Sequence, residues 1–273
     1  MFKNVLVGVD GKPNGSDAVA LAFSLTDPDG KLTLAHVRIG PGFEAEEPEA
    51  SKELLERERA GRDLGAELIS ICSESPGRGL HQQAEKQNAD LLVVGSCSHG
   101  AFGRAMLGDD TRGSLNGAPC AVAIASRGYA QQGGRESNPL TNIGVGYNAS
   151  PESDTALAMA HVLAIPTGAA VHALEVVSIP TYAYGALMPP AIGDTINVML
   201  EQATERMKEL PDVDGQAVYG LTGEELAAFS EKLDILIVGS RSYGPIRRLV
   251  LGSTSDYLQR HARGSLLVLP RGR

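Results

Sequence analysis

The sequence predicts an α/β protein built from two tandem doubly wound domains, each with a five-stranded parallel sheet flanked by helices. Two observations lead to this prediction. Short aliphatic runs, typical of strands buried on both faces, alternate with longer helical segments, and this order produces parallel sheets. The segment that begins at Asp90 also recurs at Asp234, and a repeated unit implies a repeated domain. The predicted domains are 1–128 and 141–273, joined by a linker at 129–140.

The first half reads as five strands rich in Val, Leu, Ile and Ala. These strands are expected over 5–9, 31–37, 68–72, 91–94 and 121–124. Helices are expected over 17–25, 48–64, 80–87 and 110–116. Ser16 is the expected N-cap of the first helix, because a serine hydroxyl can accept a hydrogen bond from a first-turn amide.

The second half repeats this order after the linker, which is polar and lacks apolar periodicity. Its strands are expected over 142–147, 171–177, 216–219, 235–238 and 266–269. Helices are expected to begin at Ser150–Pro151, to span 192–210 and to follow Gly252–Ser253. In such sheets, ligands bind outside the carboxyl ends of the strands. Each half therefore offers one place for a site.

The composition argues against several classes of function. A formal net charge of −9 argues against nucleic-acid binding, which draws its affinity from clustered Lys and Arg. The three cysteines and six histidines show no metal-ligand spacing, so reduced thiols are expected. A signal peptide and an apolar run long enough to cross a membrane are both missing from the sequence, so we expect no membrane association and a cytoplasmic protein.

The repeated segment has the form of a phosphate-binding loop. The first copy runs from Asp90 through Leu-Leu-Val-Val-Gly-Ser-Cys-Ser-His-Gly to Gly108 and Asp109. The second runs from Asp234 through Ile-Leu-Ile-Val-Gly-Ser-Arg-Ser-Tyr-Gly to Gly252 and Ser253. A buried strand, a glycine- and serine-rich loop and a helix N-terminus together place backbone N–H groups around an anion.

These residues make the chain resemble the universal stress protein family, in a tandem two-domain form with a Rossmann-like fold. The ATP-binding members of that family carry Gly-x2-Gly-x9-Gly-(Ser/Thr) after the fourth strand and an Asp at the end of the first strand. The two copies here keep this spacing, as Gly95-x2-Ser98-x9-Gly108-Asp109 and Gly239-x2-Ser242-x9-Gly252-Ser253. The resemblance implies binding of ATP, with or without Mg²⁺, or of a related adenine nucleotide, and a role in the stress response.

Both copies depart from the family pattern. Ser98 and Ser242 replace its second glycine, and a Cβ there restricts φ and crowds a nearby phosphate. Asp109 replaces the last hydroxyl residue of the first copy, where it would act either as a helix cap or as a ligand to a bridging cation. The first strand of the second copy ends in Asn148, whereas that of the first copy ends in Asp10.

The nucleotide is therefore expected mainly in the second domain. The residues expected to bind it are Asn148, Val176, Gly239, Ser240, Arg241, Ser242, Gly252, Ser253 and Thr254. A less complete set in the first domain comprises Asp10, Val37, Gly95, Ser96, Ser98, Gly108 and Asp109. By resemblance, the backbone at Val37 or Val176 would meet an adenine edge. The competing interpretation is that both glycine loops only make tight strand-to-helix turns.

Three functions follow as hypotheses. The first is a regulatory protein that binds an adenine nucleotide, and the second is a protein-interaction scaffold with degenerate phosphate loops. The third is a very slow ATPase, although the sequence has neither a P-loop lysine nor a convincing general base. The resemblance also implies an intramolecular pseudo-dimer in which strand 121–124 pairs antiparallel with strand 266–269, and it leaves room for a homodimer of two chains.

Overall fold

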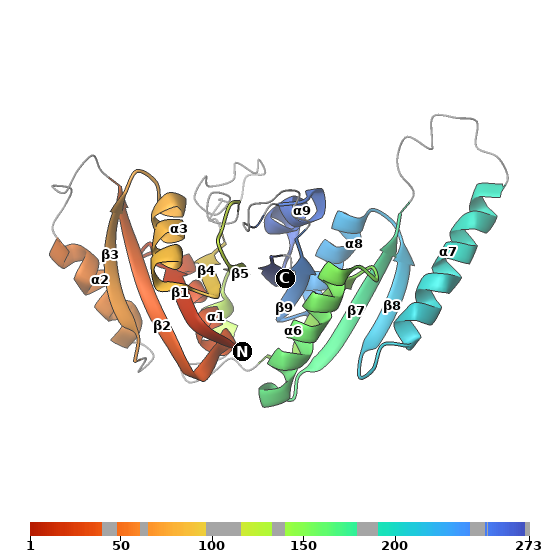
Figure 1. Ribbon diagram of the computed structural model, residues 1–273, viewed down its shortest axis with the longest axis horizontal. Helices are drawn as coiled ribbons and strands as arrows, with labels where there is room; N and C mark the ends of the chain where they lie inside the picture. Colours follow the sequence, from red (N-terminus) through yellow and green to blue (C-terminus); the bar gives the residue numbers. More distant parts are fainter. Residues whose placement is uncertain are drawn as a thin grey trace.

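A computed structural model describes residues 1–39, 48–60, 65–96, 116–132, 140–178, 191–240, 249 and 251–270. Its strands form one ten-stranded sheet in the order β3-β2-β1-β4-β5-β10-β9-β6-β7-β8. Figure 1 shows the two halves of the chain side by side, with helices on both faces of the sheet. The predicted pair of doubly wound α/β domains is confirmed.

The first half contains the elements β1 (Phe2–Gly8), α1 (Pro13–Leu25), β2 (Thr26–Ile39), α2 (Pro48–Ala60), β3 (Glu67–Ser73), α3 (Pro76–Gln87), β4 (Leu91–Gly95), β5 (Ala121–Ala125) and α5 (Tyr129–Gln132). All neighbouring strands within it are parallel. The expected strands are all present. The helix expected over 110–116 falls almost wholly outside the described residues.

The second half contains β6 (Asn142–Tyr147), α6 (Pro151–Thr167), β7 (Ala170–Val177), α7 (Ala191–Lys208), β8 (Asp214–Tyr219), α8 (Thr222–Phe229), the 3₁₀ turn η2 (Ser230–Lys232), β9 (Ile235–Gly239), α9 (Ser253–His261) and β10 (Ser265–Leu269). Its strands are also parallel to one another. The sequence analysis did not anticipate α8.

Two cores lie on opposite faces of the sheet because successive strand residues point to opposite sides. Val5 and Val7 of β1 belong to the core that also contains residues of α1, α2, α6 and α7, whereas Leu6 belongs to the core that contains residues of α3, α8 and α9. Both cores run through the two halves without a break, since Leu267 belongs to the first and Leu266 to the second.

The halves join through β5 and β10, which pair antiparallel with Leu267 opposite Ala123. Among the neighbouring strand pairs of the described sheet, this pair alone is antiparallel. It is the strand pairing that the resemblance implied. The pairing covers an edge of each half-sheet, and an uncovered edge would be open to pairing with other chains.

The repeated aspartate that opens each copy of the motif has a structural role. Asp90 accepts hydrogen bonds from the amides of Lys3 and Asn4, at 2.8 and 3.0 Å. Asp234 accepts equivalent bonds from the amides of Thr141 and Asn142, at 2.6 and 2.8 Å. Each carboxylate thus fixes the start of the first strand in its half, beside the strand that leads to the glycine loop.

Two local predictions differ from the structure. Helix α1 begins at Pro13 rather than after Ser16, because proline is favoured in the first helical turn. Ser16 is therefore not the N-cap, and its hydroxyl donates a hydrogen bond to the Glu58 carboxylate, at 2.8 Å. The first residues of the predicted linker form α5, whose Tyr129 is 1% exposed. Asp17, buried in α1, accepts hydrogen bonds from the amides of Gly128 and Ala130, both at 2.9 Å, and holds α5 against the first half.

Candidate functional site

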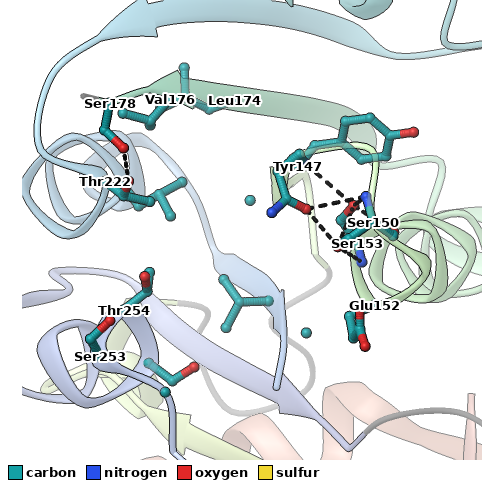
Figure 2. Close-up of a pocket in the computed structure, with 17 residues that line it drawn as sticks. Tyr147, Ser150, Glu152, Ser153, Leu174, Val176, Ser178, Thr222, Ser253 and Thr254 are labelled. Atoms are coloured by element: carbon teal, nitrogen blue, oxygen red, sulfur yellow. Dashed lines mark hydrogen bonds between the residues drawn. The ribbon is translucent and has the colours of Figure 1, made fainter. Parts of the chain in front are cut away.

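A cavity of about 240 Å³ opens at the carboxyl ends of β6, β7 and β9 in the second half. Its walls also include the first turns of α6, α8 and α9 (Figure 2). This volume is slightly below the usual range for small-molecule sites, ~300–1,000 Å³. Three helix N-termini at one cavity concentrate positive partial charge, and those of α8 and α9 have no side-chain cap over their first N–H groups, so the arrangement favours an anionic ligand.

The α6 wall is rigid because its turn is closed by side chains. The Ser150 hydroxyl accepts from the Ser153 amide at 3.3 Å, and the Ser153 hydroxyl accepts from the Ser150 amide at 3.0 Å, which makes a capping box. The side-chain oxygen of Asn148 accepts from the amide and hydroxyl of Ser150, at 3.3 and 2.6 Å. The side-chain NH₂ of Asn148 takes no part in these bonds, so it is the group that can donate to a ligand.

The α9 wall lies across the cavity from Ser150 and Ser153 (Figure 2). Gly252 is the N-cap of α9 and, with no side chain, leaves the first-turn amides uncapped. A Cβ added to Gly252 would have no heavy atom within 4 Å. The hydroxyls of Ser253 and Thr254 line the same wall. This helix start can therefore present N–H and O–H donors to a phosphate.

Val176 lines the cavity through the end of β7. Its neighbour Val177 accepts a hydrogen bond from the Gly220 amide on the β8 side, at 3.1 Å. Because the backbone groups of successive strand residues face opposite neighbours, those of Val176 face β6. The ladder between β6 and β7 ends one residue earlier, at the pair Tyr147–Glu175. The backbone of Val176 therefore turns towards the cavity, as an adenine-edge contact would require.

Gly239 lines the cavity and also packs against α6, while Ser240 is paired within the sheet. A Cβ on Gly239 would lie 2.6 Å from the Glu152 Cβ and 2.7 Å from the Glu152 carbonyl oxygen, so a side chain would clash with the first turn of α6. Ser240 is fully buried, and its amide donates to the Leu269 carbonyl at 2.9 Å, outside the cavity lining. The packing of strand against helix accounts for this glycine, and strand pairing occupies the amide.

The first half repeats this arrangement. A Cβ on Gly95 would clash with the carbonyl oxygen of Asn14, and the Ser96 amide donates to Ala125 at 3.1 Å. Asp10 and Val37 lie at the carboxyl ends of β1 and β2, as expected. The carboxylate of Asp10 accepts from the Lys12 amide at 3.1 Å and forms an exposed ion pair with its ammonium group. The remaining expected site residues, Ser98, Gly108, Asp109, Arg241 and Ser242, lie outside the described residues.

Sequence reasoning missed several residues of the cavity. Thr222 opens α8, and its hydroxyl lies 3.4 Å from that of Ser178 at the end of β7. Tyr147 lies at the end of β6 and donates to Asp154 at 2.8 Å. Desolvation by burial and the hydrogen bond to Asp154 raise the pKa of Tyr147 to about 12. The Ser-Pro pair at Ser150 was the signal that could have located the α6 wall.

Glu175 of β7 and Arg206 of α7 form an ion pair next to the cavity-lining strand β7. Arg206 of α7 donates to both carboxylate oxygens of Glu175, at 2.6 and 3.3 Å. The Glu175 side chain is 10% exposed and that of Arg206 is 42% exposed. The paired carboxylate raises the pKa of Arg206. The ion pair therefore ties α7 to the end of β7.

Neither a metal cluster nor a membrane-spanning helix is found among the described residues. In the part of the chain that the structure describes, no three His, Cys, Asp or Glu side chains come together as a metal site. Within the same residues, the helices all fall short of the length and apolar character that a membrane span requires. The site therefore depends on hydroxyl, amide and backbone groups with one carboxylate, Glu152.

Comparisons with known proteins agree with this fold. The model of the universal stress protein family matches residues 1–126 and 139–270. A universal stress protein of Mycobacterium tuberculosis is 28% identical over 290 residues, covering 97% of this chain and 96% of its own. A shorter relative, a universal stress protein of Thermus aquaticus, is 30% identical over 139 residues and covers 45% of this chain.

Solved structures show the same architecture. A universal stress protein from Archaeoglobus fulgidus matches with a TM-score of 0.61 at 17% identity, covering 98% of each chain. A putative universal stress protein from Pseudomonas aeruginosa matches with a TM-score of 0.66 at 14% identity, covering 99% of this chain and 94% of its own. Since the family model matches both repeats, the chain belongs to the universal stress protein family, in a tandem two-domain form.

Proposed function

We propose that this protein is a regulatory protein of the stress response that binds ATP or a related adenine nucleotide, mainly in the second domain. The observation that carries the proposal is the convergence of three helix N-termini on a cavity at the carboxyl ends of parallel strands. In doubly wound sheets this is the place where nucleotides bind.

The cavity offers groups for each part of such a ligand. The base would lie along β7, where the backbone of Val176 is turned inwards. Asn148 would donate its amide NH₂ to a ribose hydroxyl. The phosphates would meet Gly252, Ser253 and Thr254 at the start of α9, where anion binding needs no basic side chain.

The first test is a measurement of bound nucleotide. The full chain is purified without added nucleotide and denatured, and the released adenine nucleotides are quantified against protein by mass spectrometry. About one per chain supports a tight site in the second domain, while about two would show that Asp109 does not block the first. If none is released, titration with ATP and Mg²⁺ up to millimolar concentration decides, and the absence of binding there refutes the proposal.

One observation favours the second hypothesis, a protein-interaction scaffold. The amides of Ser96 and Ser240, which a phosphate loop would offer to its ligand, donate instead to Ala125 and Leu269. In this alternative, the sheet joined through β5 and β10 acts as an intramolecular pseudo-dimer that presents a surface to other proteins, a second copy of the chain among them. Nucleotide binding tighter than about 10 μM, roughly −7 kcal/mol, would count heavily against it.

A further inference from the structure

Helix α6 carries no charged side chain beyond its first turn. Its residues 155–167 read Thr-Ala-Leu-Ala-Met-Ala-His-Val-Leu-Ala-Ile-Pro-Thr, without Asp, Glu, Lys or Arg. One side of the helix packs on the sheet, where Ala160 and Leu163 are fully buried. A helix that is hydrophobic all round is normally buried all round. In α6, however, Val162 is 42% exposed and Ile165 is 82% exposed, so part of this apolar surface faces solvent.

The equivalent helix of the first half, α1, is covered by α5 on its outer side. Asp17 of α1 accepts two backbone hydrogen bonds from the segment 128–130. Two turns further along α1, the hydroxyl of Ser24 accepts a hydrogen bond from the Tyr129 hydroxyl of α5, at 3.4 Å. Ala20 lies between Asp17 and Ser24 on the same side of the helix and is 3% exposed. The first half therefore buries this side of its helix within its own fold.

The corresponding side of α6 is open to solvent. Counted from the proline that begins each helix, it consists of Thr155, Ala158, Val162 and Ile165, all of them exposed. We call these four residues the outer stripe of α6. Among the described elements, the main contacts of α6 are with the strands β6, β7, β9 and β10, which lie on its other side. The second half thus presents an uncharged helix surface where the first half has a packed one.

The outer stripe has the spacing of a helix–helix contact. Its members recur at intervals of three, four and three residues, the pattern by which one helix packs along another. The stripe is also symmetric about Ala160. A second α6 running antiparallel would therefore set Ala158 opposite Val162 and Thr155 opposite Ile165, with a smaller side chain facing a larger one each time. Such pairs suit the packing of ridges into grooves.

The charge of the protein also favours this stripe as the place where two copies meet. Each chain carries a formal net charge of −9, so two copies repel one another over most approaches. The outer stripe has no charged member, and antiparallel pairing brings no like charges together across it. A two-fold contact also needs only one self-complementary patch, because both copies use the same residues.

We propose that the outer stripe of α6 is a docking surface for a second copy of this chain, which pairs through its own α6 in the antiparallel direction. A contact made by one pair of helices is smaller than a standard interface, so the dimer should be weak and should depend on concentration. The proposed dimer does not require a ligand in the cavity.

Sedimentation velocity of the full chain from about 5 to about 500 μM tests the proposal, since a contact of this size should dissociate within that range. The natural chain should shift from monomer to dimer as the concentration rises. Ile165→Lys places a charge in the stripe and should weaken dimerisation at least about tenfold. Because Ile165 is 82% exposed, the fold should persist. Val162→Lys is a second variant with the same expected effect, and thermal melting followed by circular dichroism checks that both variants fold.

Two further variants make the result specific. Val198→Lys changes an exposed valine of α7, so it should leave dimerisation unchanged. Thr155→Glu combined with Ile165→Lys should restore the dimer, because the introduced carboxylate of one copy would face the introduced ammonium group of the other. Within one chain these two positions lie about three turns apart and cannot pair.

Four results would overturn the proposal. The first is a natural chain that stays monomeric over the whole range, and the second is a dimer that Ile165→Lys leaves intact. The third is a dimer that the double variant does not restore. The fourth is a dimer that Val198→Lys weakens as much as Ile165→Lys does.

Discussion

Two glycines of the repeated motif should respond in opposite ways to the same substitution, alanine. Gly239 has no room for a Cβ, since the atom would lie 2.6, 2.7 and 2.8 Å from the Cβ, carbonyl oxygen and carbonyl carbon of Glu152. Two of these are backbone atoms of a capped helix and cannot move far. Gly252 has φ −76° and ψ 167°, which alanine adopts without strain, and open space beyond its Cα.

Gly239→Ala should therefore lower the free energy of unfolding by about 2–3 kcal/mol, the upper part of the range for overpacking. For a chain of this size, the melting temperature should fall by about 5–10 °C. Gly252→Ala should cost at most about 1 kcal/mol, because alanine is only a poorer N-cap than glycine. Because Gly252 lines the cavity next to the place proposed for phosphate, the new methyl group should nevertheless crowd the ligand and lower ATP affinity at least about tenfold.

Differential scanning calorimetry on both variants measures the change in melting temperature, and ATP titration measures the change in affinity. Gly95→Ala is the matched control for Gly239→Ala, because its Cβ would clash with the backbone of Asn14 in the first half. A Gly252→Ala variant that binds ATP like the natural chain would place the phosphates elsewhere. A Gly239→Ala variant with unchanged stability would show that the strand-to-helix packing argument is wrong.

Three other predictions follow from the site and its surroundings. Ser253→Asp should abolish most nucleotide binding by placing a carboxylate at the start of α9, and equilibrium dialysis with ATP would check it. Arg206→Ala should lower the free energy of unfolding by about 1–3 kcal/mol, because it leaves the Glu175 carboxylate buried without its ion pair; the partial exposure of Arg206 keeps the effect in this range. Urea denaturation measures the change, and a value below about 0.5 kcal/mol would contradict the prediction. Burial, with a smaller contribution from the charge of Asp90, raises the pKa of the Cys120 thiol from 9.0 to about 12. The folded chain at pH 8 should therefore label with iodoacetamide at exposed Cys72 and not at buried Cys120. The Cys120 thiol ionises at a lower pH in the unfolded chain than in the folded chain, so its contribution to the free energy of unfolding is present below pH 9 and is lost as the pH rises to about 12. Urea midpoints of the natural chain and of Cys120→Ala, compared across this pH range, would reveal the loss.

The fold could be predicted from the sequence because the signal for strands is strong here. Central strands such as Leu91–Gly95 and Ile235–Gly239 are continuous aliphatic runs, buried on both faces, and their position before a glycine loop marks the carboxyl end of the sheet. Helix α8 was missed because its segment, Thr222–Phe229, is short and begins without a side-chain cap. Tertiary packing, rather than local sequence, stabilises a helix of this length.

The site was predicted less completely, because a motif gives spacing but not the use of each group. The sequence marks Gly239 and Gly252 alike, and only the structure separates a glycine needed for packing from one facing open space. Likewise, the Ser240 amide donates to Leu269, a contact that depends on the pairing of β9 with β10. Glu152 carries no motif signal, and only the structure places it in the lining of the cavity.

Backbone hydrogen bonds also connect the segment before the cavity's α9 wall to the first half. The Gly117 amide donates to the Leu249 carbonyl at 2.8 Å, and the Leu249 amide donates to the Ala118 carbonyl at 2.9 Å. Leu249 lies three residues before Gly252, while Ala118 lies three residues before β5. In addition, β5 pairs with β10, which follows α9 in the chain. The start and the end of α9 are therefore both connected to the segment 117–125 of the first half. A ligand that orders the start of α9 should also stabilise the hydrogen bonds between Leu249 and the residues Gly117 and Ala118. Saturating nucleotide should therefore slow amide exchange at Gly117 as well as at Ser253.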